Sequence, residues 1–266
     1  MTVSELAYLL QTKSFYIYGN GYIAQRFFTC VENLGALRNL AGVIVTKADG
    51  RTIGINGKPV ASIEEIRDTG ALLLIAVHDA VVKEMEAVAN RLGFQNVIWI
   101  YPYLWQLELG EPVKKNYSIS VVQLAVAQKF YNVVIDYLAI QHILEGKSSN
   151  LYIKMQCAWS SSNVAEKRMV AFKEKILDVV KNGTHGSPPV KITERQELFD
   201  GMHRTAMALY FGMKTIEADV YSGAKNLYGE NGIYRKGVLL EEDLPKHYTS
   251  EEIDEIKEAN RKIRRL

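Results

Sequence analysis

One segment of the sequence, residues 196–212, combines a short strand, a tight turn and a helix that begins with strongly polar side chains. It consists of Gln-Glu-Leu-Phe-Asp-Gly-Met-His-Arg-Thr-Ala-Met-Ala-Leu-Tyr-Phe-Gly. Strand character stops at Asp200 and Gly201, and the helical pattern that follows places His203 and Arg204 on its first turn. A helix N-terminus carries unpaired backbone N–H groups and the positive end of the helix dipole. The segment therefore predicts a phosphate site.

This segment and its surroundings resemble the ParB/sulfiredoxin superfamily, whose members share a strand, an Asp/Gly-Gly-x-His-Arg motif and a helix. The ordered match consists of a helix at 165–181, a Pro188-Pro189-Val190 entry into a strand, the motif at 200–205, its helix ending at Gly212, and a strand at 216–221. The order of these elements is more specific than the short motif alone. The resemblance implies an α+β domain in this part of the chain.

The branch of this superfamily that is most similar is the free serine kinase, which carries Asp-Gly-His-His-Arg at the motif. The resemblance implies that Asp200 orients a hydroxyl group or a metal ion. It also implies that the phosphates of ATP or ADP, with Mg²⁺ as their partner, bind to the first turn of the helix. The residues that this assigns to phosphate binding are Gly201, His203, Arg204 and Thr205. Phosphoryl transfer suits such a site, because positioning and charge neutralisation supply most of the catalysis.

A glutamate on the preceding helix is the base in that kinase family, and Glu166 is the nearby match. Asn163 and Glu166 also have capping-box spacing, which gives Glu166 a structural alternative. Met202 stands where the kinase has its first histidine and where sulfiredoxins have a reactive cysteine. A thioether cannot be deprotonated, so thiol chemistry is excluded at this position. Only one capped helix is expected after residue 221, which argues against DNA binding of the ParB kind.

The first part of the chain predicts a second α/β arrangement. A strand at 14–18 leads into Gly19-Asn-Gly-Tyr-Ile-Ala and a helix that ends near residue 34. A strand, a Gly-x-Gly-x-x-Ala turn and a helix are typical of a Rossmann-like domain, and they make Gly19 and Gly21 candidates for cofactor binding. The glycines could equally serve close packing of helix and strand. Further strands are expected at 40–45, 71–77 and 97–100, with a helix at 80–92.

The end of the second expected strand lacks the acidic residue that usually holds a dinucleotide ribose. It consists of Val45-Thr46-Lys47, and the first acidic residue, Asp49, comes late. Dinucleotide oxidoreductase chemistry is therefore disfavoured. The turn at 57–60 followed by Ser62-Ile-Glu-Glu resembles the small Rossmann-like domains of sugar acyltransferases and other surface-polysaccharide proteins, which implies nucleotide-sugar binding or a purely structural role.

Three regions are expected: a Rossmann-like domain at 1–103, a helical bridge at 104–147, and a ParB/sulfiredoxin-like domain at 148–266. The bridge holds an apolar pattern at 121–144 that predicts one helix or a broken pair, with surplus apolar surface for a homo-oligomer. Alternation at 151–155 predicts a strand. The chain ends in a helix that Thr249 and Glu252 cap.

The composition limits the classes of partner. The net charge is +2, with acidic and basic residues interleaved, which argues against a dedicated nucleic-acid or membrane-surface binder. No membrane span and no leader segment are expected, so the predicted location is cytoplasmic. Cys30 and Cys157 both lie among apolar residues and are interpreted as reduced core side chains rather than metal ligands. No metal site is expected within the protein itself.

The sequence predicts an α/β protein with an N-terminal parallel sheet and a C-terminal α+β domain. The predicted function is a nucleotide-dependent phosphotransferase, a kinase for a small molecule or a sugar, with Asp200 and Glu166 as its catalytic carboxylates. The alternative is a non-catalytic protein that binds a nucleotide or nucleotide-sugar in surface-polysaccharide metabolism.

Overall fold

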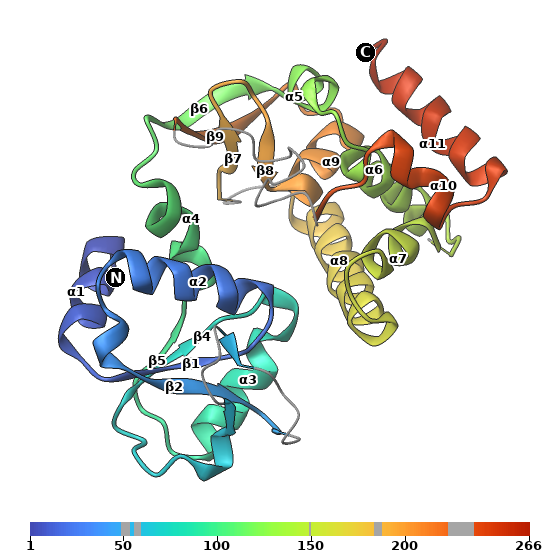
Figure 1. Ribbon diagram of the computed structural model, residues 1–266. Coiled ribbons are helices and arrows are strands. Elements are labelled where there is room, and N and C mark those ends of the chain that lie inside the picture. Colours follow the sequence, from blue (N-terminus) through green and yellow to red (C-terminus); the bar gives the residue numbers. More distant parts are fainter. Residues whose placement is uncertain (49–53, 56–59, 149, 184–187, 223–236) are drawn as a thin grey trace. The chain divides into compact units, whose positions relative to one another are not determined.

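The computed structural model of the chain describes all residues except 49–53, 56–59, 149, 184–187 and 223–236 (Figure 1). The chain divides into two compact units, Met1–Gly110 and Glu111–Leu266. Each unit has its own buried core. The turn expected at 57–60 falls largely on residues outside the described part of the chain.

The first unit alternates strands and helices. Its elements are α1 (Val3–Thr12), β1 (Phe15–Tyr18), α2 (Tyr22–Asn33), a single helical turn at Leu37–Asn39, β2 (Leu40–Val45), β3 (Val60–Ser62), a second single turn at Ile63–Glu65, β4 (Leu72–Ile75), α3 (Asp79–Arg91), β5 (Val97–Trp99) and α4 (Tyr101–Leu109). A capping box starts α1, in which the Thr2 hydroxyl accepts from the backbone N–H of Glu5 and the Glu5 carboxylate accepts from that of Thr2.

The five strands form one parallel sheet in the order β3-β2-β1-β4-β5. This confirms the predicted α/β class with a parallel sheet. All four residues of β4, Leu-Leu-Leu-Ile, are buried, as expected for a parallel strand with helices on both faces. The strand order changes direction between β1 and β4. In sheets of this kind, ligands usually bind at such a point, outside the carboxyl ends of the strands.

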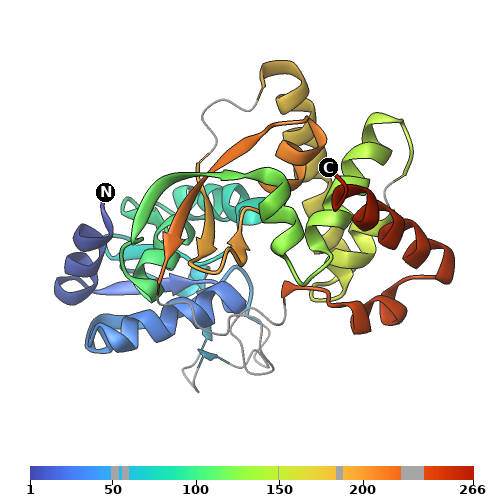
Figure 2. The same cartoon turned by 90° about the horizontal axis from the view of Figure 1, so that it is seen from above.

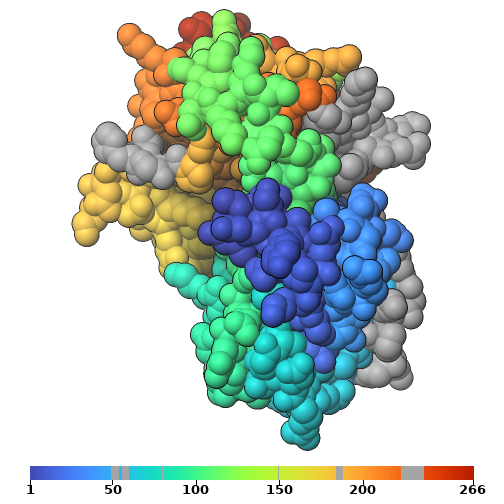
Figure 3. Space-filling model, turned by 90° about the vertical axis from the view of Figure 1, so that its left-hand side faces the viewer, coloured from blue at the N-terminus to red at the C-terminus, as the bar shows by residue number. Residues whose placement is uncertain are grey.

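Helices cover both faces of this sheet. Alternate side chains of β1 point to opposite faces of the sheet. Phe15 and Ile17 belong to the core under α1, α2 and α4, whereas Tyr18 belongs to the core under α3. Helix α1 lies at the surface of this unit (Figure 3, dark blue). Each fully buried Phe or Ile contributes about 1.5–3 kcal/mol to folding.

The second unit contains a mixed sheet and a group of helices. Its elements are β6 (Lys114–Ser120), α5 (Val121–Ala127), α6 (Asn132–Leu144), α7 (Asn150–Cys157), α8 (Ser162–Asn182), β7 (Val190–Thr193), β8 (Leu198–Asp200), α9 (Met202–Tyr210), β9 (Thr215–Tyr221), a single helical turn at Glu241–Asp243, α10 (Leu244–His247) and α11 (Ser250–Ile263). The sheet order is β6-β9-β7-β8.

The mixed sheet joins segments that are distant in sequence. Strand β6 pairs antiparallel with β9, and Figure 2 shows the two side by side in green and orange. Strands β7 and β9 are parallel, and the hairpin strand β8 and helix α9 form the connection between them. The strand predicted after Pro188-Pro189, the short strand before the His-Arg motif, the helix of the motif and the closing strand are therefore all present.

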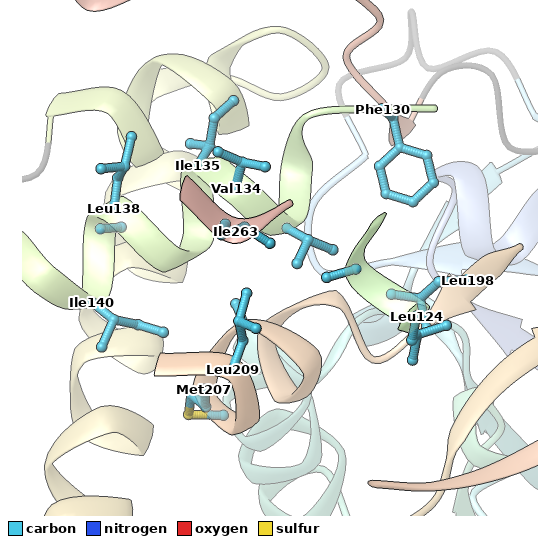
Figure 4. Packing of buried hydrophobic residues seen from close by; sticks show 14 of the residues in the cluster. Leu124, Phe130, Val134, Ile135, Leu138, Ile140, Leu198, Met207, Leu209 and Ile263 are labelled. Carbon is cyan, nitrogen blue, oxygen red and sulfur yellow. The ribbon is translucent and has the colours of Figure 1, made fainter. Parts of the chain in front are cut away.

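Helix α6 lies at the centre of the second unit. Eight of its thirteen residues are buried, including Val134, Ile135, Leu138 and Ile140. Figure 4 shows these side chains beside residues from α5, α9 and α11. A helix that is buried nearly all round has no fixed outer face, so polar residues within it must find partners inside the protein.

The structure corrects three expectations about this unit. Residues 151–155 belong to helix α7 rather than to a strand. The expected bridge at 104–147 is divided: α4 packs into the first core through Leu104, whereas α5 and α6 build the second core. The unit boundary consequently falls after Gly110, and not at 103. The broken pair of helices expected at 121–144 is confirmed as α5 and α6.

Two further features concern expectations from composition. Cys157 is exposed at the end of α7, so the interpretation as a core cysteine is wrong for it. Cys30 is buried, and burial raises the pKa of its thiol to about 12. Among the described residues, no helix combines the length and the apolar character that crossing a membrane requires.

Candidate active site at the start of helix α9

The turn into α9 depends on a glycine. Gly201 caps the helix with φ +101°, in the left-handed region that disfavours L side chains. A Cβ atom at this position would lie 2.5 Å from Cγ1 of Val190 and 3.1 Å from a guanidinium nitrogen of Arg204. Both the backbone angle and the space require glycine here. Among the described residues, no side chain makes a capping hydrogen bond to this helix start.

Arg204 is held by acceptors from its own surroundings. Its guanidinium donates to Oδ2 of Asp200 at 3.0 Å, to the carbonyl of Pro189 at 2.8 Å and to the carbonyl of Pro188. The predicted phosphate ligand therefore fixes the Pro-Pro entry of β7 to the start of α9. Its side chain remains 19 % exposed.

Asp200 lies between two cations. Oδ2 is 3.0 Å from Arg204 and 3.6 Å from Nζ of Lys191 on the neighbouring strand β7. The spacing follows from the hairpin, in which Lys191 and Asp200 are paired across β7 and β8. Sequence reasoning missed Lys191, although its place directly after Pro188-Pro189-Val190, nine residues before Asp200, is a usable signal. The site thus has a surplus of positive charge.

Thr205 is buried and its hydroxyl donates to the carbonyl of Gly201 at 3.0 Å. This bond lies within the first turn of α9. The hydroxyl that was predicted to contact phosphate therefore already has an acceptor in the described structure. Bonding of a threonine hydroxyl to the carbonyl four residues earlier is common in helices.

His203 packs against two aromatic side chains and lies near one acidic side chain. Its ring stacks on Phe172 of α8, with centroids 4.3 Å apart. Nε2 lies 3.2 Å from the hydroxyl of Tyr152 on α7 and 3.7 Å from Oδ1 of Asp136 on α6. The imidazole is 35 % exposed, so one side of it faces the protein and the other is accessible.

Asp136 is the functional candidate that sequence reasoning missed. Its side chain is 1 % exposed, and neither carboxylate oxygen has a hydrogen-bond partner among the described residues. Burial raises the pKa of this carboxyl group well above its ordinary value of 3.8. In the sequence, Asp136 is one of several polar residues in an apolar helical pattern, and nothing there indicates what its side chain faces.

Glu166 does not join this group. It is exposed on the first turns of α8, and it makes no hydrogen bond or ion pair within the described part of the chain. Helix α8 begins at Ser162 with Ser161 as its N-cap, so Asn163 lies inside the helix and the expected capping box is not formed. Neither the catalytic nor the capping prediction for Glu166 gains a contact from the structure.

The glycines of the first unit have separable roles. Gly19 has φ +128°, and a Cβ there would lie 2.9 Å from the carbonyl oxygen of Ala76 at the end of β4. Packing between β1 and β4 accounts for this residue. Gly21 caps α2 without a side-chain bond, and a Cβ there would meet nothing within 4 Å. Asp49, the late acidic residue after β2, lies outside the described residues.

The described residues contain no cluster of three His, Cys, Asp or Glu side chains that could hold a metal ion. A comparison of the chain with known protein families, curated proteins and solved structures found no match in any of the three.

Proposed function

We propose that the second unit binds a nucleotide and that the start of α9 holds its phosphates. The observation that carries this proposal is the surplus of positive charge at a helix N-terminus that no described side chain caps. Lys191 and Arg204 share one carboxylate, Asp200, and His203 stands on the same first turn. Backbone N–H groups and the helix dipole add to the attraction for an anion.

The residues suit a phosphate group better than a metal ion. Oδ2 of Asp200 already faces two cations, which weakens it as a ligand for Mg²⁺. Glu166 lies exposed without a contact to Asp200 in the described structure. We therefore assign no protein ligand to Mg²⁺, which would accompany ATP or ADP through their phosphates.

Binding is tested by titrating ATP, ADP, CTP and UDP-sugars, with and without Mg²⁺, into wild type and Lys191→Met. A lysine-phosphate contact is a charge-assisted bond, and its loss should weaken binding of the preferred nucleotide about tenfold or more, since such bonds contribute roughly 1.5–3 kcal/mol. The matched control is Lys214→Met, because Lys214 is an exposed lysine beyond the opposite end of α9. Calorimetry measures the dissociation constants. Equal affinities for wild type and Lys191→Met would contradict the proposed site.

Arg204→Ala is a poor probe of this site, because Arg204 also ties the carbonyls of Pro188 and Pro189 to α9. Its replacement would change the fold of the turn together with any phosphate contact. Lys191 makes no such backbone bond in the described structure, so its removal reports more directly on ligand charge.

Phosphoryl transfer is the second candidate function, favoured by the carboxylate of Asp200 beside the cationic groups. In this reaction the acceptor hydroxyl oxygen forms a bond to the γ-phosphorus of ATP. The bond from that phosphorus to the bridging oxygen breaks, ADP leaves, and the hydroxyl proton passes to a base. Asp200 would orient the hydroxyl group, and Glu166 is the predicted base. The acceptor class is a small hydroxyl compound or a sugar.

Transfer is tested by ADP release in the presence of a panel of sugars, amino acids and polyols. An enzyme shows acceptor-dependent ADP release that falls at least a hundredfold in Asp200→Asn, in line with the usual contribution of an acid-base or orienting group. Nucleotide binding without acceptor-dependent ADP release would leave the second unit as a binding module, with the surface-polysaccharide role as its context.

A further inference from the structure

The group formed by Asp136, His203 and Tyr152 is not explained by nucleotide binding alone. Asp136 comes from α6, Tyr152 from α7 and His203 from α9, and Phe172 of α8 covers the ring of His203. Four helices therefore converge on one imidazole. The carboxyl group beneath it has no hydrogen bond among the described residues, which is unusual for a side chain with 1 % exposure.

An isolated buried carboxylate is costly, whereas a protonated carboxyl group is tolerated in an apolar site. His203 can carry the same proton, because imidazole titrates in the neutral range. The separation of 3.7 Å between Oδ1 and Nε2 is within the range of an ion pair but longer than a hydrogen bond. Transfer of a proton between them requires the two atoms to approach to hydrogen-bond distance.

Within the described part of the chain, few other groups near this pair could take the proton. The hydroxyl of Tyr152 lies 3.2 Å from Nε2 of His203. Tyr248 donates its hydroxyl to the carbonyl of Leu151. On α11, Glu252 is paired with Lys154, and Glu255 is paired with His142.

We propose that Asp136 and His203 hold a single proton between them, and that an anion bound at the start of α9 moves it from the carboxyl group to the imidazole. The O–H bond of Asp136 breaks and an N–H bond forms at Nε2 of His203. The net charge of the pair stays at zero, so no proton is taken from solvent. The inference rests on the anion site proposed above and makes Asp136 a positioning residue for it.

The transfer has a physical reason on each side. Without a ligand, the low-dielectric surroundings of Asp136 favour the neutral pair. A bound anion stabilises the imidazolium, and the carboxylate that remains stabilises it from the opposite side. The protein thereby gains a third positive group at the site only when a negative ligand is present. Ligand affinity then becomes insensitive to pH across the neutral range.

The experiment uses sulfate, which keeps its charge throughout the neutral range and therefore adds no titration of its own. Sulfate affinity is measured on the full chain by NMR between about pH 6.5 and 8, where imidazole titrates. Wild type should change by less than about twofold. In Asp136→Asn, His203 must take its proton from solvent to form the imidazolium. The sulfate affinity of this variant should therefore fall about tenfold per pH unit above the pKa of His203.

The matched control is Glu255→Gln, which makes the same acid-to-amide change beside His142, in an exposed His–carboxylate pair at a 2.8 Å separation. It should keep the pH profile of wild type. A profile for Asp136→Asn that matches wild type would overturn the inference, as would a wild type that loses affinity tenfold per pH unit.

A second measurement needs no variant and covers the case in which Asp136→Asn does not fold. The ring nitrogens of His203 in wild type report its protonation state by NMR. Adding sulfate at constant pH should convert the neutral imidazole to imidazolium. Absence of sulfate binding, or binding without this conversion, would overturn the inference. Neither result depends on a nucleotide, so failure here is distinct from failure of nucleotide binding or transfer.

Discussion

At the scale of single residues, the start of α9 is determined by what fits beside Val190. Gly201 is the position at which strand β8 turns into a helix, and no side chain has space there. The neighbouring Asp200 and Arg204 depend on this turn for their ion pair. A change at Gly201 should therefore affect both the fold and the proposed phosphate site.

We expect Gly201→Ala to destabilise the second unit by more than a comparable change elsewhere. The left-handed backbone costs an L residue roughly 1–2 kcal/mol, and overpacking against Val190 adds about 1–3 kcal/mol. Gly212→Ala is the matched control, because Gly212 has φ +70° but open space around its Cβ position. Urea unfolding measures both free energies of unfolding.

The contributions of backbone strain and of overpacking can be separated by making Gly201→Ala in a protein that also carries Val190→Ala. Val190→Ala removes the 2.5 Å contact with Cγ1 but keeps Cβ, which lies 2.9 Å from the Cβ position of residue 201. The cost of Gly201→Ala should therefore fall part of the way towards that of Gly212→Ala. An unchanged cost in this background would show that the steric account is wrong.

His203 and Arg204 were recognised from the sequence because a helix start with two polar residues is a local pattern. Their partners could not be recognised in the same way. Asp136 lies 67 positions earlier on another helix, and Lys191 contributes through a cross-strand pairing. Such contacts arise from tertiary packing, which periodicity within one element does not report.

At the scale of elements, prediction worked where local signals were strong. The helix at Ser250–Ile263 was expected from its capping box, and the Thr249 hydroxyl does accept from the backbone N–H of Glu252. Strands buried on both faces, such as β4, were equally clear. In both cases the residues themselves define the element.

Two elements were misjudged for identifiable reasons. The buried residues of α7 follow a helical period and are Leu151, Tyr152, Met155 and Gln156. Over residues 151–155, however, aliphatic side chains also alternate with other types, which is typical of a strand. Strand β6 was not recognised, because five of its seven residues are exposed and its partner β9 lies far along the chain. A polar edge strand is specified mainly by its neighbour.

The cap of α11 gives a second prediction. Thr249→Ala should lower the stability of the second unit by about 1 kcal/mol, because the hydroxyl that satisfies the N-terminal N–H is lost. Thr2→Ala removes the corresponding hydroxyl from the capping box of α1 and is the matched control in the first unit. Hydrogen exchange, read for each unit separately, should show each loss in its own unit only.

The same cap predicts an acid dependence. Burial pushes the pKa of Glu252 upward, but its hydrogen bonds with Lys154 and the backbone of Thr249 outweigh this and lower it below 4.5 overall. A carboxylate whose pKa is lowered in the folded state stabilises the fold at pH values above its unfolded-state pKa. This contribution is lost as the pH falls through the folded-state pKa. Glu252→Gln should therefore flatten the acid limb of the stability profile of the second unit, measured by urea unfolding below about pH 5. An acid limb as steep as that of wild type would contradict this account.

At the scale of the whole molecule, the chain consists of two units with separate cores. The first unit closes its core with α4, whose Leu104 packs beside α1 and α2. Its Arg26 forms an ion pair with Glu108 of α4 and lies over the ring of Trp105 at 4.1 Å. The first unit therefore contains every element that its sheet needs for burial on both faces.

This organisation predicts that residues 1–110 fold when expressed alone. A fragment that ends at 103, the boundary expected from sequence, would lack most of α4 and leave Arg26 without Glu108. We expect the longer fragment to unfold cooperatively in urea and the shorter one to be unfolded or strongly destabilised. Equal behaviour of the two fragments would contradict the role assigned to α4.

The burial of Asp136 on α6 has a consequence for how this protein responds to selection. An acid at the centre of the second core lowers stability, and an apolar residue of similar size would remove that cost. A library screened only for heat resistance should therefore be enriched in substitutions at position 136. The same library screened for ligand binding should retain the acid, which makes this position a place where the two pressures act in opposite directions.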